Sequence, residues 1–245
     1  MNVDAYFVPA GVEPADVAER TAVVIDVIRA TSTIVTALAH GARAVYPTVS
    51  TEDALKLASS LGRDDTLLCG ERKGLKVDGF DLGNSPAEYT EETVGDKRLV
   101  MSTTNGTRAF AAAAGAERVV AASFLNLGAV ADALEGAEEL VVICAGKEDR
   151  FSLDDAVCAG HLLRELEERG GEPLGTDDAA TAALRLAAEL TPDEAFLRST
   201  RAGLALVEIG LESDLALCAR RDVFAHAPEM EDRVIRLSSG GSESE

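Results

Sequence analysis

The sequence predicts an α/β protein with three layers, α/β/α, around a sheet that is largely parallel or mixed. Short runs rich in β-branched residues, such as residues 23–28 and 141–144, are typical of strands buried on both faces. Alanine-rich stretches with helical spacing follow these runs, so strands and helices alternate along the chain. A weak similarity between residues 20–90 and 96–165, offset by 74 or 75 residues, indicates an internal duplication of βα units.

Seven short apolar runs predict the strands. Each contains valine, isoleucine, leucine or aromatic residues and is bounded by residues that favour turns. In chain order they occupy residues 5–8, 23–28, 44–46, 66–69, 99–101, 141–144 and 234–237.

Capping residues and helical spacing predict the helices. The first runs from residue 34 to 40 and ends at Gly41, and the second has acids in its first turn. Thr191 begins a capping box with proline at the first helical position, which predicts a further helix. The other helices are expected at residues 51–61, from 109 onward, at 153–168 and at 176–190.

The domain organisation follows from length and from these elements. With 245 residues, the chain can bury a sizeable core. We expect one domain over residues 1–237, with a helix-rich final third. The stretch at residues 70–86 is long, glycine-rich and polar, which predicts a functional loop. Residues 238–245 are rich in serine, glycine and glutamate and predict a disordered tail.

The composition argues against several classes of function. A net charge of −20 disfavours nucleic acid as a partner, because phosphate backbones need a cationic surface. No apolar run approaches ~20 residues, so we expect no membrane span, and a chain start without signal-peptide features predicts a cytoplasmic protein. The four cysteines and three histidines are scattered, which disfavours zinc and disulfide frameworks. A homo-oligomer stays an open alternative.

Polar side chains follow four of the predicted strands and suggest a site for an anion. Ligands of parallel sheets bind beyond the carboxyl ends of the strands, so we expect the turns after residues 28, 69, 101 and 144 to converge at one edge. Arg29 offers a fork of donors for phosphate or carboxylate and is a candidate catalytic residue. The candidates for substrate binding are Thr31, Ser32, Thr33, Arg72, Asn84, Thr103, Thr104, Asn105, Gly106, Arg108 and Lys147.

Four acids among these cations predict a divalent metal. Mg²⁺ is held by a few carboxylates together with substrate oxygens, and its candidate ligands here are Asp26, Glu71, Asp154 and Asp155. Asp26 is also a candidate nucleophile that attacks phosphorus directly. The sequence leaves both roles open. The position two residues after Asp26 is Ile28 rather than the second aspartate of aspartate-nucleophile phosphatases, which counts against that superfamily.

A cysteine offers a competing interpretation. Cys144 is followed by five residues and then Arg150, the spacing that cysteine phosphatases use around a phosphate. The acids at positions 148 and 149 oppose both phosphate binding and formation of a thiolate. A buried cysteine at the end of a strand is therefore the favoured interpretation.

Together these motifs resemble the ComB family of 2-phosphosulfolactate phosphatases. The resemblance is carried by residues 24–32, 70–72, 79–86 and 103–107, and extends to 151–155 and 214–220. It implies an α/β/α fold and Mg²⁺-dependent hydrolysis of 2-phosphosulfolactate to 3-sulfolactate and phosphate, a step toward coenzyme M. Another small 2-phosphocarboxylate as substrate, or a non-catalytic protein that binds an anionic metabolite, are the alternatives. Seven candidate residues fall within the matching motifs: Asp26, Arg29, Glu71, Arg72, Asn84, Asn105 and Asp154.

Overall fold

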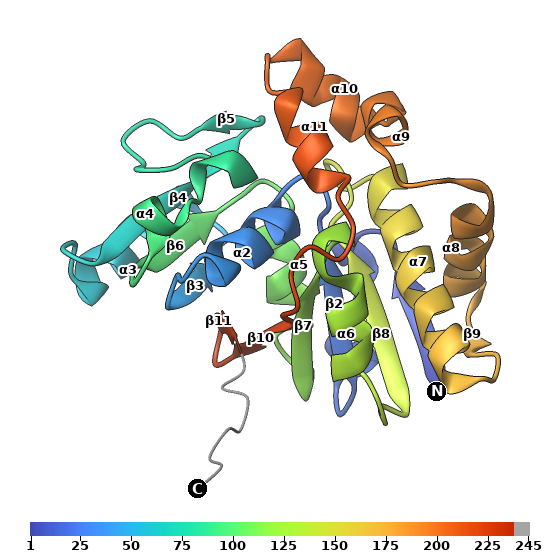
Figure 1. The fold of residues 1–245 in the computed structure, drawn as a ribbon. Coiled ribbons are helices and arrows are strands. Elements are labelled where there is room, and N and C mark those ends of the chain that lie inside the picture. The colour runs from blue at the N-terminus through green and yellow to red at the C-terminus, as the bar shows by residue number, and fades with distance from the viewer. Residues whose placement is uncertain (238–245) are drawn as a thin grey trace, which may run out of the picture.

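The computed structural model describes residues 1–237, and they form an α/β/α fold around one mixed sheet (Figure 1). The predicted disordered tail lies outside the described residues. The eleven strands are β1 (Asn2–Tyr6), β2 (Thr21–Ile25), β3 (Ala44–Pro47), β4 (Thr66–Arg72), β5 (Leu75–Lys76), β6 (Arg98–Ser102), β7 (Arg118–Ala122), β8 (Glu139–Cys144), β9 (Gly175–Thr176), β10 (Pro228–Glu231) and β11 (Val234–Leu237). Their order in the sheet is β5-β4-β6-β3-β11-β10-β7-β2-β8-β1-β9.

The helices connect and cover these strands. The α-helices are α1 (Pro14–Val17), α2 (Ala30–Ala39), α3 (Thr51–Leu61), α4 (Glu91–Val94), α5 (Gly106–Ala113), α6 (Leu127–Ala133), α7 (Leu153–Gly170), α8 (Asp178–Glu189), α9 (Glu194–Ser199), α10 (Arg201–Glu208) and α11 (Ser213–Cys218). Three short 3₁₀ helices are η1 (Pro9–Gly11), η2 (Pro86–Glu88) and η3 (Phe124–Asn126). No α-helix within residues 1–237 is long and apolar enough to cross a membrane.

The alternation of side chains along β2 shows why the sheet is buried on both faces. Val23 and Ile25 pack into one core, with residues of α6 and α7. Ala22 and Val24 point the other way and pack into a second core, with residues of α2 and α5. A strand that is apolar on both sides needs helices on both faces, which confirms the predicted three-layer fold.

Two groups of parallel strands make up most of the sheet. In one, β6 lies between β4 and β3, and in the other, β2 lies between β7 and β8. The middle strand of each trio therefore comes from the other half of the predicted repeat. Two copies of a βαβαβ unit that exchanged their first strands would form this arrangement. The duplication itself stays a prediction.

The β10–β11 hairpin joins the two groups, and the strands of one group run in the opposite direction to those of the other. β11 is antiparallel to β3, and β10 is antiparallel to both β11 and β7. The carboxyl ends of β2 and β8 thus belong to one group and those of β4 and β6 to the other, seen on the right and left of Figure 1. The expectation that all four turns share a single edge was therefore wrong, and the contacts described below bring two edges together.

Several element boundaries also differ from those expected. β1 begins at Asn2 rather than at residue 5, and α2 begins at Ala30 rather than at residue 34. β4 continues to Arg72 and pairs with β5, so the first part of the expected loop is a hairpin. The predicted capping box is wrong as well, because Asp193 caps α9 by accepting a hydrogen bond from the Phe196 N–H.

Candidate active site

A small cavity of about 80 Å³ lies where the turns after the central strands meet. Its walls come from the turn after β2, the β4–β5 hairpin, the loop after β5, the turn after β6, the loop after β8, and α10. Helices α9 to α11 gather beyond this end of the sheet, at the top of Figure 1. The predicted site residues that line the cavity are Asp26, Arg29, Glu71, Asn84, Thr104, Asn105 and Lys147.

The turn after β2 places Asp26 at the cavity. The Thr31 hydroxyl donates to the Asp26 carbonyl over 2.8 Å and accepts from the Asp26 N–H over 2.9 Å, which closes the turn. The Ala30 N–H donates to Asp26 Oδ1 over 3.2 Å. Within residues 1–237 no donor is bonded to Oδ2, so this side chain, 5% exposed, keeps one oxygen for a ligand.

The turn after β6 is closed in a similar way and lies against Asp26. The Thr107 hydroxyl donates to the Thr103 carbonyl over 3.0 Å, and the Thr107 N–H donates to the Thr103 hydroxyl over 3.2 Å. A Cβ atom at Gly106 would lie only 2.6 Å from Asp26 Oδ2. Glycine therefore allows this turn to approach the carboxylate closely.

Two of the four predicted metal ligands hold neighbouring turns together. Glu71 accepts hydrogen bonds from the Gly74 N–H over 2.6 Å and from the Thr104 N–H over 2.7 Å, one on each oxygen. Asp155 likewise accepts from Val27 and Gly146, over 2.9 and 3.0 Å. These carboxylates align the four turns.

Burial raises the pKa of three acids at the site, and neighbouring carboxylates add to the increase for two of them. Burial raises the pKa of Asp26 to about 7, and the charges of Asp154 and Glu71 add to the increase, whereas the Ala30 N–H and Arg29 oppose it. Burial also raises the pKa of Asp154, against a hydrogen bond that the Ser152 hydroxyl donates over 2.6 Å. The pKa of Asp155 is raised by burial and then by the charge of Asp154. A nearby cation would relieve this repulsion.

A Mg²⁺ ion fits two of these acids better than all four. Within residues 1–237, no group of three or more His, Cys, Asp or Glu side chains is arranged to hold a metal ion. Mg²⁺ often takes only one or two carboxylates and completes its shell with water and phosphate oxygens. Asp26 and Asp154 each accept a hydrogen bond on one carboxylate oxygen, whereas Glu71 and Asp155 accept on both. The first two therefore keep an oxygen for an ion, and of these only Asp26 lines the cavity. The Mg²⁺ site itself stays a prediction.

Arg29 lines the cavity but is already neutralised. One of its terminal nitrogens, Nη1, donates to Asp214 Oδ2 over 2.7 Å, and these side chains are 3% and 1% exposed. The other, Nη2, donates to the Gly74 carbonyl over 2.6 Å. The Ser85 hydroxyl donates to the second Asp214 oxygen over 2.6 Å. Arg29 thus holds the hairpin and α11 in place.

The other predicted arginines lie outside the cavity. Arg72 donates to the carbonyl and the hydroxyl of Ser102, over 3.1 and 2.8 Å, and so braces β4 against β6. Arg108 forms an ion pair with Asp149 over 2.9 Å, and both side chains are largely exposed. Neither guanidinium group lines the cavity. The predicted role of both arginines in binding the substrate stays a prediction.

The hydroxyl groups at the start of α2 form hydrogen bonds within the protein. Thr31 closes the turn described above, the Ser32 hydroxyl donates to the Val27 carbonyl over 2.8 Å, and the Thr33 hydroxyl donates to the Asn84 carbonyl over 2.9 Å. All three residues are fully buried and none lines the cavity. Their predicted role in binding the substrate stays a prediction, whereas their hydroxyl groups shape the turn, and the same holds for Thr103.

Two buried polar atoms at the cavity have no partner. Asn84 Oδ1 and Thr104 Oγ1 are buried and form no hydrogen bond with the described residues. An unsatisfied buried polar atom costs free energy, so each favours a bound ligand or water. Lys147 also lines the cavity and forms no ion pair within residues 1–237, while its charge lowers the pKa of Asp154.

The cysteine alternative is not supported. Cys144 is fully buried, and it does not line the cavity. Burial raises its pKa well above the ordinary value, and the charge of Asp155 raises it further. A thiol in such surroundings does not ionise readily and is a poor nucleophile.

Two contributions come from distant parts of the chain for which the sequence predicted no role, although the resemblance extends to residues 214–220. α10 covers the cavity with Ala202, Ala205 and Leu206, and Ile209 follows directly after the helix. Asp214 on α11 neutralises Arg29. A single acid in the otherwise apolar stretch at residues 214–218 was the available signal for Asp214, whereas the spacing of α10 is that of any amphipathic helix.

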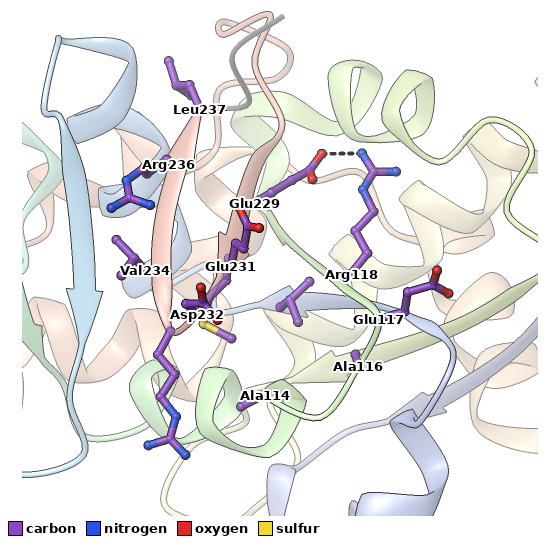
Figure 2. Close-up of a pocket in the computed structure, with 13 residues that line it drawn as sticks. Ala114, Ala116, Glu117, Arg118, Glu229, Glu231, Asp232, Val234, Arg236 and Leu237 are labelled. Atoms are coloured by element: carbon purple, nitrogen blue, oxygen red, sulfur yellow. Dashed lines mark hydrogen bonds and ion pairs between the residues drawn. The ribbon is translucent and has the colours of Figure 1, made fainter.

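A larger cavity lies elsewhere and is separate from this chemistry. It has a volume of about 860 Å³ and adjoins the start of β7, the end of α5 and the β10–β11 hairpin. Figure 2 shows the ion pair between Arg118 and Glu229 at its wall. Its lining carries several acids and none of the predicted site residues.

The chain is similar to one family of known proteins over nearly all its length. A family model described as 2-phosphosulpholactate phosphatase matches residues 6–233. A probable 2-phosphosulfolactate phosphatase of Thermotoga petrophila is 43% identical over 220 residues, which cover 89% of this chain and 92% of the relative. Proteins of the same description from Clostridium acetobutylicum and Clostridium perfringens (strain 13) are 38% and 40% identical, and the matches cover 94% and 98% of this chain and 97% and 98% of those relatives.

Proposed function

Because the chain belongs to the 2-phosphosulfolactate phosphatase family, we propose that it hydrolyses 2-phosphosulfolactate to 3-sulfolactate and phosphate with the help of Mg²⁺. The observation that carries this proposal is the position of Asp26. Its carboxylate is buried at the cavity and lies against the glycine of a second turn, with a free oxygen. A negative group in this place suits a phosphoryl ester only if cations accompany it.

The residues of the cavity have different roles in binding the substrate and in the reaction. Lys147 faces the acids and neutralises the charge of the phosphoryl group, and the free Thr104 hydroxyl donates to one of its oxygens. Asn84 Oδ1, which has no partner among the described residues, is available to accept a hydrogen bond from a water molecule. When bound by Asp26 and Asp154, Mg²⁺ would polarise the phosphoryl group. Arg29 keeps the hairpin wall in position.

A phosphate-release assay tests the proposal. The protein is expected to release phosphate from 2-phosphosulfolactate when Mg²⁺ is present, and to lose that activity in excess EDTA. Asp26→Asn should lower kcat by about 10³-fold, the order of effect seen when key electrostatic or acid–base groups are removed, while the circular dichroism spectrum stays unchanged.

The possible outcomes separate the alternatives. Full activity in excess EDTA would remove the metal from the mechanism. Tight ligand binding with no turnover, strengthened by Asp26→Asn, would favour a non-catalytic binding protein. An acid-stable, radiolabelled phosphoenzyme that disappears in Asp26→Asn would assign Asp26 as the nucleophile rather than as a metal ligand.

A further inference from the structure

The turn of the β4–β5 hairpin places a lysine at the mouth of the cavity. Lys73 and Gly74 form this turn, between the paired residues Arg72 and Leu75. Their φ angles are 55° and 83°. Two-residue turns with positive φ at both positions favour asparagine and glycine, and a lysine there carries a backbone cost. The turn therefore holds a lysine although its backbone conformation favours other residues.

The site itself fixes the turn that carries Lys73. Arg29 Nη2 donates to the Gly74 carbonyl and the Gly74 N–H donates to Glu71 Oε2, both over 2.6 Å. A Cβ atom at Gly74 would lie 2.6 Å from Ile209 Cδ1, so the turn also lies directly against the residue that follows α10. A hairpin tip is ordinarily mobile, but this one is held from both sides. The lysine is therefore presented at a defined place.

The two lysines that line the cavity, Lys73 and Lys147, come from different walls of it. Neither Lys73 nor Lys147 forms an ion pair within residues 1–237. The charge of Lys147 lowers the pKa of Asp154, which places it beside the acids. The turn that carries Lys73 lies against Arg29 and Ile209, whereas Asp26 lies against Gly106. Lys73 therefore belongs to a different wall of the cavity from Asp26.

We propose that Lys73 binds an anionic group of the substrate other than the phosphoryl group, and so selects multiply anionic phosphate esters over simple ones. The inference rests on the proposed function, which places the phosphoryl group beside Asp26. An ammonium group is a compact charge that suits a carboxylate and a sulfonate equally. In a protein of net charge −20, an unpaired cation that lines the cavity gives such a substrate a local attraction.

Substrates that lack one anionic group test this assignment. Lys73→Met is expected to lower kcat/KM for 2-phosphosulfolactate by about 10- to 100-fold, as the loss of a charged hydrogen bond does. 2-Phospholactate lacks the sulfonate, and the phosphate ester of 2-hydroxyethanesulfonate lacks the carboxylate. Lys73→Met should leave kcat/KM nearly unchanged for whichever analogue lacks the group that Lys73 binds. Lys73→Arg should restore part of the loss.

A neighbouring lysine provides the matched control. Lys76 lies on the same hairpin, is exposed and does not line the cavity, so Lys76→Met should leave all three kcat/KM values unchanged. Equal losses on all three substrates in Lys73→Met, or no loss on any, would overturn the proposal. If the wild-type protein shows no phosphatase activity, the proposed function fails. Calorimetric binding of 2-phosphosulfolactate to wild type and Lys73→Met then decides the role of Lys73.

Discussion

At Gly106 the turn after β6 approaches Asp26 closely. A methyl group at Gly106 would lie 2.6 Å from Asp26 Oδ2 and 2.5 Å from Ala30 Cβ, so one of the two turns must shift. We expect Gly106→Ala to lower kcat about 10²-fold by moving the carboxylate, and to lower the free energy of unfolding by about 1–3 kcal/mol. Phosphate release and urea denaturation measure the two effects.

Gly115 is the control for that substitution. A methyl group there would first meet Val17 Cγ2 at 3.6 Å, an ordinary van der Waals distance. Gly115→Ala should therefore keep both activity and stability. Full activity in Gly106→Ala would show that the carboxylate does not need its present position.

Asp26 also predicts how stability depends on pH without a divalent cation. Its pKa is raised from 3.8 to about 7 by burial, so between these values the folded protein binds more protons than the unfolded chain. The free energy of unfolding therefore falls as the pH rises through this window, by as much as a few kcal/mol. Urea denaturation in EDTA at pH 5 and pH 8 should show the decrease in wild type and a smaller one in Asp26→Asn. Equal slopes in the two proteins would contradict this account.

At the scale of elements, α11 is tied to the site by a buried ion pair. Asp214 neutralises Arg29 and accepts a hydrogen bond from Ser85, so its removal leaves a buried guanidinium without a counter-ion. We expect Asp214→Ala to lower the free energy of unfolding by about 3–5 kcal/mol. The exposed pair of Arg198 and Glu194 on α9 should contribute less than about 1 kcal/mol, which Glu194→Ala tests in the same assay. Similar losses in both variants would show that burial of the pair is unimportant.

The elements differ in how well the sequence predicts them. β2, β8 and α7 follow from apolar runs and capping residues that act locally, and their existence was predicted correctly. The polar turn at Asp26 was recognisable for the same reason. Arg29 and Arg72 show the limit of this reasoning: a sequence reveals a cation but not its partner, and their partners lie on α11, in the hairpin turn and on β6. The direction of the two strand groups depends on a hairpin at the far end of the chain.

For the whole molecule, the topology places the site between the two groups of parallel strands. These groups contact each other through the sheet and also through the turns at the site. The turn after β6 reaches Asp26 of the other group, and the Glu148 N–H donates to Asn105 Oδ1 over 3.2 Å across the same boundary. Within the sheet, the β10–β11 hairpin is inserted between β3 and β7. The relative position of the two groups therefore decides whether the cavity is formed.

Ile235 provides a test of this coupling far from the site. It is fully buried, belongs to the core under α2 and α5, and forms the register pair of β11 with Val45 of β3. Ile235→Ala should lower the free energy of unfolding by about 2–5 kcal/mol through the cavity that it leaves. Because the hairpin also sets the position of one group against the other, we expect kcat/KM to fall although no site residue changes. Arg236→Ala alters an exposed neighbour on the same strand and should change neither quantity. A less stable Ile235→Ala protein with unchanged kcat/KM, measured where it is fully folded, would show that contacts at the site hold the two groups together without the hairpin.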